Sequence, residues 1–126
     1  MKAIVIDDDI DTVEVLSEFL ELKGINVVGK GYNGRQAVEL YEKHTPDIVL
    51  LDIMMPDYDG FYAISEIRKI NSDVKILTIT ADISIKTKRK LNELRVSKVV
   101  FKPYDIDNIL NIIYGIEDGQ TIFLSL

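Results

Sequence analysis

Two spacings of apolar residues alternate along the chain. Consecutive apolar residues, such as those from Ile48 to Leu51, are typical of a strand buried on both faces of a parallel sheet. Between such runs, apolar residues recur every three or four positions, which is the spacing of an amphipathic helix. Residues 10–23 have this spacing, with glutamates between the apolar positions, and Gly24 ends the segment.

Five strand–helix pairs of this kind follow one another. Strands are expected at 3–6, 25–29, 48–51, 75–80 and 98–101, and helices at 10–23, 34–43, 61–70, 84–94 and 106–114. This alternation predicts a doubly wound α/β domain, a five-stranded parallel sheet with helices on both faces. The pattern contains no linker or repeat, so we expect one domain over residues 1–126 with its core at about 2–114. The tail, 115–126, ends in an apolar segment that either packs on the domain or binds a partner as a strand.

Composition excludes several kinds of site. The 126 residues contain no cysteine and one histidine, His44, which excludes disulfide frameworks, thiolate metal sites, cysteine nucleophiles and multi-histidine metal centres. The formal net charge of −6 argues against general binding to nucleic-acid backbones. No apolar run approaches the roughly 20 residues of a membrane span, and the N-terminus does not resemble a signal peptide. We therefore expect a soluble, cytoplasmic protein that contacts neither membranes nor nucleic acid directly.

Polar residues stand at the ends of four of the five expected strands. Aspartates 7–9 follow the first strand, Asp52 follows the third, Thr80 ends the fourth and Lys102 follows the fifth. In open parallel sheets, ligands bind outside the carboxyl ends of the strands. If these four strands are neighbours, one rim of the sheet collects carboxylates, a hydroxyl and an ammonium group.

Crowded carboxylates repel one another unless a proton or a cation relieves them. Oxygen ligands without His or Cys nearby favour Mg²⁺, which keeps several waters and takes only one or two carboxylates. A magnesium ion, a nucleophilic carboxylate, a lysine and a hydroxyl donor are together typical of phosphoryl transfer, because the transferring oxygens need counter-charges. The rim therefore predicts Mg²⁺-dependent phosphoryl chemistry.

Four blocks of sequence also carry a resemblance to a known family. The blocks are Ile6-Asp7-Asp8-Asp9, the segment from Pro46 to Gly60 with Asp52, Met55-Pro56 and Asp59-Gly60, then Thr80-Ala81 and Lys102-Pro103. In this order and at these distances they resemble the receiver domains of two-component response regulators, the CheY-like proteins, over about residues 2–114. The resemblance implies a flavodoxin-like sheet with strand order 2-1-3-4-5. It also implies a signalling domain that catalyses only its own phosphorylation and dephosphorylation.

The resemblance assigns roles to the acidic residues. Asp52 is expected to be the phosphoacceptor, whose carboxylate attacks the phosphohistidine of a sensor histidine kinase or phosphotransfer protein. Asp8 resembles the direct Mg²⁺ ligand, and Asp7 a neighbour that acts mainly through a bound water. Asp52 and the backbone carbonyl of Met54 would complete the protein's share of the metal ligands. Asp9 is expected to cap the first helix.

Further roles follow for the residues after the last two strands. Lys102 would pair with the phosphoryl oxygens, Thr80 would hydrogen-bond to them after transfer, and Pro103 would follow a cis peptide bond. One position departs from the family pattern, because Val99 stands where the family usually has an aromatic residue that reports the state of the threonine. Phe101, on the same expected strand face, is a candidate substitute.

A basic segment is expected to matter for partners. Six of the fifteen basic residues lie within thirteen positions, at Lys86, Lys88, Arg89, Lys90, Arg95 and Lys98. They form either a solvated helix face or a docking surface for an acidic downstream protein. In the resembled family, the surface around the fourth helix, the fifth strand and the fifth helix carries the output signal, and a phosphorylation-dependent dimer is a further expectation.

Three alternatives compete with this interpretation. A literal G-x-G-x-x-G motif is formed by Gly29, Gly31 and Gly34, with Asp52 eighteen residues further on, which fits a dinucleotide-binding enzyme. The same segment can also be interpreted as a pair of loop glycines followed by the start of a helix. Asp7, Asp9, Asp11 and Glu18 fit four positions of a calcium loop, but Thr12 stands where that loop needs glycine. An Asp7-x-Asp9 pair also occurs in aspartate-nucleophile phosphatases, which would leave the Asp52 motif unexplained.

Overall fold

The computed structural model describes residues 1–117, in which strands and helices alternate strictly. The strands are β1 (Lys2–Ile6), β2 (Asn26–Gly31), β3 (Ile48–Asp52), β4 (Lys75–Thr80) and β5 (Lys98–Phe101). The helices are α1 (Ile10–Leu22), α2 (Gly34–His44), α3 (Gly60–Ile70), α4 (Ile85–Glu93) and α5 (Ile106–Glu117). The strands pair in parallel in the order β2-β1-β3-β4-β5, which confirms the predicted doubly wound sheet.

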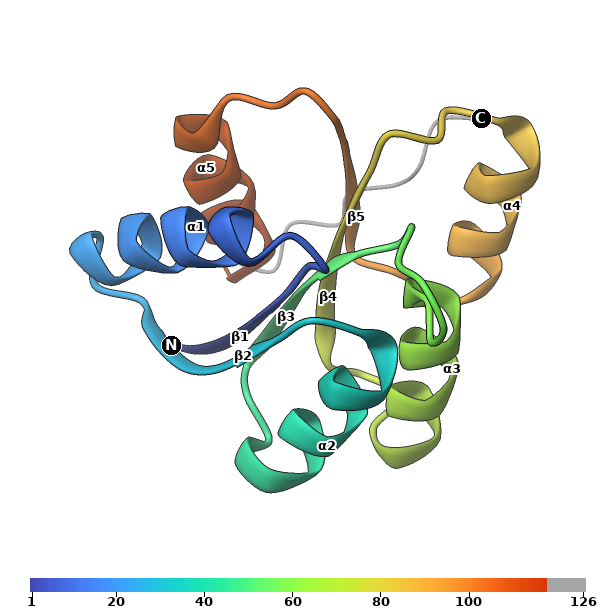
Figure 1. The fold of residues 1–126 in the computed structure, drawn as a ribbon, viewed down its shortest axis with the longest axis horizontal. Helices are drawn as coiled ribbons and strands as arrows, with labels where there is room; N and C mark the ends of the chain where they lie inside the picture. Colours follow the sequence, from blue (N-terminus) through green and yellow to red (C-terminus); the bar gives the residue numbers. More distant parts are fainter. Residues whose placement is uncertain (118–126) are drawn as a thin grey trace.

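Helices cover the sheet on both faces (Figure 1). Successive residues of a strand point to opposite faces, so Ile4 and Ile6 pack in the cluster beneath α2, α3 and α4, whereas Ala3 and Val5 pack in the cluster beneath α1 and α5. Every residue of β3 is buried, as its unbroken apolar run predicts for the central strand of a parallel sheet.

Short polar side chains start the helices at one edge of the sheet. Asp9, Asn33, Asp59 and Ser84 each accept a hydrogen bond from a backbone N–H in the first turn of α1, α2, α3 and α4 respectively. Such caps satisfy donors that the helix itself leaves unpaired. Because each helix follows a strand, these helix starts all lie at the carboxyl edge of the sheet, around the predicted site.

The glycines of the G-x-G segment belong to a strand. The sequence predicts a strand that ends at residue 29, followed by a glycine pair in a loop, but β2 continues to Gly31. A Cβ atom on Gly29 would lie 2.9 Å from a side-chain carbon of Leu40, and one on Gly31 would lie 2.8 Å from Ile6. The loop assignment was wrong, because these glycines are needed for the close packing of β2 against α2 and β1.

Only the first three residues of the predicted tail, 115–117, lie within the described part of the chain. Residues 115–117 extend α5 beyond the predicted end at 114. The apolar segment 121–126 lies outside the described residues. Within residues 1–117, no helix has the length and apolarity needed to cross a membrane.

Candidate functional site

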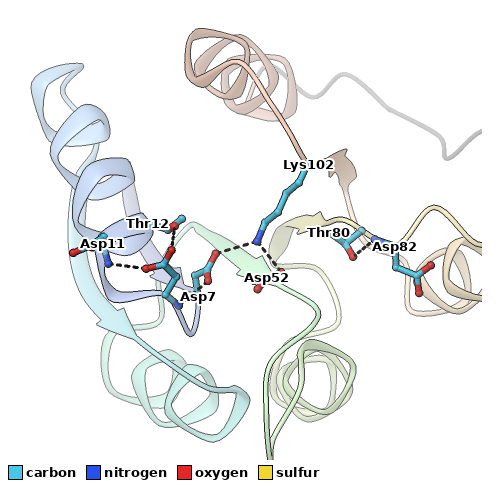
Figure 2. A network of polar contacts seen from close by, with 8 residues as sticks. Asp7, Asp11, Thr12, Asp52, Thr80, Asp82 and Lys102 are labelled. Atoms are coloured by element: carbon cyan, nitrogen blue, oxygen red, sulfur yellow. Dashed lines mark hydrogen bonds and ion pairs between the residues drawn. The ribbon is translucent and has the colours of Figure 1, made fainter.

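The register of the sheet brings the predicted site residues to one rim. Ile6 pairs with Leu51, Asp52 with Ile79, and Thr80 with Phe101. Asp7 therefore follows β1 directly beside Asp52, while Lys102 follows β5 directly beyond Thr80. Figure 2 shows Lys102 extending from the end of β5 toward Asp7 and Asp52.

Three carboxylates form a compact acidic cluster. Asp7 and Asp52 are 5% and 3% exposed, whereas Asp8 is exposed to solvent. One oxygen from each of the three carboxylates lies within 4.8 Å of the others. Asp9 does not join them: its carboxylate accepts hydrogen bonds from the Asp11 backbone N–H at 3.1 Å and the Thr12 hydroxyl at 2.9 Å. The prediction that Asp9 caps the first helix is confirmed.

Lys102 supplies the positive charge of the site. Its Nζ lies 3.5 Å from Asp7 Oδ2 and 3.5 Å from Asp52 Oδ1. The backbone holds the residue in place, because Lys102 N–H donates to the Thr80 carbonyl at 2.8 Å. The predicted cis peptide bond between Lys102 and Pro103 is present.

Burial dominates the electrostatics of the cluster. Desolvation, with further repulsion from Asp7, raises the pKa of Asp52 to about 6, and Lys102 opposes this only in part. Desolvation also raises the pKa of Asp7, against a hydrogen bond from the Asp9 backbone and the charge of Lys102. Burial on its own lowers the pKa of Lys102, but the charges of Asp52 and Asp7 outweigh it, so that this pKa is raised overall. One ammonium group therefore leaves the cluster short of positive charge.

The donor set fits a magnesium ion. The cluster offers only oxygen ligands, from two buried carboxylates and one exposed carboxylate within a few ångströms. Mg²⁺ prefers such oxygens and keeps waters in its remaining positions, which an exposed rim permits. Met54 lies at this rim two residues after Asp52, with an exposed side chain. The role of its carbonyl as a ligand stays a prediction.

Thr80 lies at the rim, but its hydroxyl is hydrogen-bonded to the loop after β4 and not to the carboxylates. It is fully buried, and its Oγ1 accepts a hydrogen bond from the Asp82 backbone N–H at 3.1 Å (Figure 2). Sequence analysis did not single out Asp82. The pattern Asp-x-Ser just before a helix is a capping signal that could have drawn attention to it.

The departure at Val99 is accommodated by packing. Val99 is 5% exposed and belongs to the same core cluster as Leu91 of α4. Phe101 is half-buried and packs against that cluster too, so it lies on the same face, as predicted. The ammonium group of Lys88, from α4, lies 5.4 Å from the centre of the Phe101 ring. An aromatic ring therefore lies between β5 and α4, two residues along the strand from the family's usual place.

The dinucleotide alternative is not supported. The start of α2, where a bound pyrophosphate would need free N–H groups, is already occupied by the chain itself. Gly34 N–H donates to the Tyr58 carbonyl at 2.6 Å, and Asn33 accepts from the Gln36 N–H. The calcium-loop alternative also fails, because α1 runs from Ile10 through the second half of the supposed loop.

Comparisons with known proteins agree with this geometry. The family model described as "Response regulator receiver domain" matches residues 3–114. The chain is 30% identical over 112 residues to the chemotaxis protein CheY of Bacillus subtilis, covering 89% of this chain and 93% of that protein. A chain in the crystal structure of a complex of CheX, CheY, BeF3 and Mg²⁺ from Borrelia burgdorferi is 25% identical, with a TM-score of 0.87 and coverage of 93% and 89%.

A receiver domain protein from Methanospirillum hungatei matches with a TM-score of 0.89 over 94% of each chain, and at 20% identity this likeness concerns the fold alone. The family model spans all four sequence blocks, and the fold and strand order agree with it. The chain belongs to the family of response regulator receiver domains of two-component systems.

Proposed function

We propose that the chain is a phosphorylation-dependent signalling switch that accepts a phosphoryl group on Asp52 from the phosphohistidine of a sensor histidine kinase or phosphotransfer protein. An oxygen of the Asp52 carboxylate forms a bond to phosphorus, and the P–N bond of the donor breaks. The imidazole leaves with the electron pair of that bond. The observation that carries the proposal is the buried Asp52 carboxylate, 3.5 Å from Lys102 Nζ and beside two further carboxylates.

Asp52 is better suited to be the nucleophile than its neighbour. One oxygen of Asp7 accepts a 2.9 Å hydrogen bond from the Asp9 N–H, which engages it in the turn that leads into α1. Asp52 stands at the end of the central strand, between the acidic residues after β1 and Thr80 on β4. With a pKa of about 6, its carboxylate is mostly ionised at pH 7, which is the form that can attack phosphorus.

Mg²⁺ is the cofactor that we propose, held by Asp7, Asp8 and Asp52 with the Met54 carbonyl. When bound, it neutralises charge on the carboxylates and on the phosphoryl oxygens. The protein's own residues do the remaining work. Lys102 orients the phosphoryl oxygens through its ammonium group, and the acidic pair of Asp7 and Asp52 holds that group over the site.

We propose further that phosphorylation alters a surface around α4, β5 and α5 that docks a downstream protein. The basic segment Lys86–Lys98 supports an acidic partner. Among the described residues, the ion pairs within 4.0 Å involve none of its six basic side chains, so their charge is available to a partner. Two of them lie over aromatic rings, Lys88 over Phe101 and Lys90 over Phe61.

Intact-mass analysis with acetyl phosphate as a small phosphodonor tests the proposal. We expect a single phosphoryl adduct that forms with Mg²⁺ and does not form with a chelator. Asp52→Asn should abolish the adduct because an amide is a far weaker nucleophile. The matched control is Asp57→Asn, an exposed acid of the same loop, which should keep it. An adduct that persists in Asp52→Asn and is lost in Asp57→Asn would contradict the assignment.

A further inference from the structure

Helix α4 is held to the sheet by few buried side chains. Only Thr87 and Leu91 of its nine residues are buried, whereas the eleven-residue α3 buries Gly60, Ala63, Ile64 and Ile67. Most of its other side chains are charged and point toward solvent. A helix with so little apolar burial depends on polar contacts at its two ends to fix its position.

The C-terminal end of α4 is clamped to α3 by one arginine. The Arg68 guanidinium donates to the carbonyl oxygens of Leu94 at 3.2 Å, Arg95 at 2.8 Å and Val74 at 2.7 Å. These carbonyls belong to the turn after α4 and to the turn before β4. Because the guanidinium is rigid and planar, three bonds to it fix this end of the helix.

The N-terminal end is held by a chain of hydrogen bonds that starts at the site. Thr80 Oγ1 accepts from the Asp82 N–H at 3.1 Å (Figure 2), and the Asp82 carboxylate accepts from the Ser84 N–H at 2.9 Å. The other carboxylate oxygen accepts from the Thr87 hydroxyl at 2.5 Å. These hydrogen bonds connect Thr80, at the rim of the site, to the buried Thr87 in the first turn of α4.

A helix cap alone does not require the Asp82 carboxylate. Ser84 is already the cap of α4, and its hydroxyl accepts from the Thr87 N–H at 3.2 Å. The bond from Asp82 to Thr87 is therefore additional, and it engages one of the two residues that anchor the helix. Hydrogen bonds from Thr87 and Ser84 also lower the pKa of Asp82, so the carboxylate is charged when it accepts them.

We propose that the Asp82 carboxylate is a positioning residue that ties the first turn of α4 to Thr80, so that movement of the Thr80 hydroxyl moves this end of the helix. The hydroxyl can donate its proton to a phosphoryl oxygen while it still accepts from the Asp82 N–H. Displacement of Thr80 toward Asp52 then draws Asp82 and Thr87 with it, and α4 pivots about the end that Arg68 holds. This coupling rests on the proposed function, but the link between Asp82 and Thr87 does not.

Hydrogen exchange of the unphosphorylated protein tests the link itself. Thr87→Val keeps the shape of a buried side chain and removes its hydroxyl, and Asp82→Ala removes the acceptor. Each should speed exchange of the amides of residues 85–90 roughly tenfold, the size expected when a hydrogen bond to a charged group is lost. The double variant should be little faster than Asp82→Ala alone, because Asp82→Ala already removes the bond to Thr87 together with the bond to the Ser84 N–H.

The matched control is Thr78→Val. Thr78 is fully buried on β4 and donates its hydroxyl to the Lys98 carbonyl, outside this chain of bonds. The Thr78→Val variant should leave the exchange rates of the amides of residues 85–90 unchanged. Exchange in Thr87→Val within about twofold of the wild-type rate would overturn the inference, since one lost bond to a charged group predicts more.

Beryllofluoride, which mimics the phosphoryl group, tests the coupling. With Mg²⁺ it should change exchange across residues 81–90 in the wild type and in Thr78→Val, and this change should be lost in Asp82→Ala and Thr87→Val. Equal changes in all four proteins, or no change in a wild type that is phosphorylated normally, would overturn the coupling. A wild type that acetyl phosphate fails to phosphorylate would instead contradict the proposed function, and the exchange rates of the free variants would still decide the link.

Discussion

Asp7 and Asp52 lie side by side at the ends of β1 and β3, both almost fully buried, and share the ammonium group of Lys102 at 3.5 Å each. The parallel register pairs Ile6 with Leu51, so the next residue along the chain in each case, Asp7 and Asp52, must lie side by side. Two buried carboxylates with one cation are short of positive charge, and desolvation raises the pKa of both. The same arrangement that suits a metal and a phosphoryl group therefore destabilises the metal-free protein.

The metal-free protein should lose stability as the pH rises from about 4 to about 7. The folded-state pKa of Asp52, about 6, exceeds its ordinary value of 3.8, so the folded protein binds more protons than the unfolded chain in this range. Ionisation of Asp52 lowers the free energy of unfolding. This loss is absent below pH 3.8, grows as the pH rises toward 6 and is complete above pH 6. It amounts to about 3 kcal/mol, at ~1.4 kcal/mol per pKa unit.

Urea denaturation in a chelator, at several pH values, checks this by comparing the wild type with Asp52→Asn. The variant has no carboxylate at this position and should be the more stable protein at pH 7, with the difference shrinking toward pH 4. A difference that does not vary with pH would show that Asp52 does not titrate near 6.

Mg²⁺ should stabilise the wild type and have much less effect on Asp8→Ala. Binding to the folded state alone raises the free energy of unfolding by RT ln(1 + [L]/Kd), which is about 2.7 kcal/mol at one hundred times Kd. Removing the exposed carboxylate takes away a proposed ligand, while in a chelator it also removes a repelling charge. The melting temperature measured with and without millimolar Mg²⁺ tests this, and a wild-type curve that Mg²⁺ leaves unmoved would contradict a shared site.

Lys102→Gln should destabilise the metal-free protein at pH 8 by roughly 1–2 kcal/mol. The change leaves two buried carboxylates without their cation, and the estimate allows for the partial exposure of the lysine. The control is Lys30→Gln, which breaks the exposed ion pair with Glu14 and should cost less than about 0.5 kcal/mol. Equal losses in the free energy of unfolding of the two variants, measured by urea denaturation, would show that Lys102 stabilises the protein no more than an exposed ion pair does.

Gly34→Ala should weaken Mg²⁺ binding although the residue is not a ligand. A Cβ atom at Gly34 would lie 2.8 Å from the Tyr58 carbonyl oxygen and closer still to that of Asp59. The loop between β3 and α3, which carries Met54, would have to move, at a cost of roughly 1–3 kcal/mol in stability.

The control for this variant is Gly24→Ala. Gly24 has a φ of +87° and open space around it, so the substitution strains the backbone far from the site. Both variants should lose stability, but a Mg²⁺ titration should detect weaker binding only in Gly34→Ala. Unchanged affinity in Gly34→Ala would show that the loop is not held by this contact.

Much of the fold and of the acidic cluster is predictable from local pattern. An unbroken apolar run such as Ile48–Leu51 requires a strand buried on both faces, and the residue after it must emerge at the carboxyl edge of the sheet. Asp52 could therefore be placed before the structure was known. The cap at Asp9 likewise follows from its position just before an amphipathic segment.

Contacts between distant segments were not predictable in this way. Gly29 and Gly31 look like a phosphate-binding loop in sequence, and only the approach of Leu40 and Ile6 shows why glycine is needed there. The three carbonyls that meet Arg68 come from two separate turns. No spacing along the chain encodes such a contact, because it depends on how the helices pack against the sheet.

Chemical localisation of the phosphoryl group decides whether Asp52 is the phosphoacceptor. Borohydride reduces an aspartyl phosphate to homoserine, which peptide mass spectrometry can place at a single position. After treatment with acetyl phosphate and Mg²⁺, we expect homoserine at position 52, and none there when a chelator replaces the metal. Homoserine at position 7, 8 or 57 with aspartate intact at 52 would contradict it.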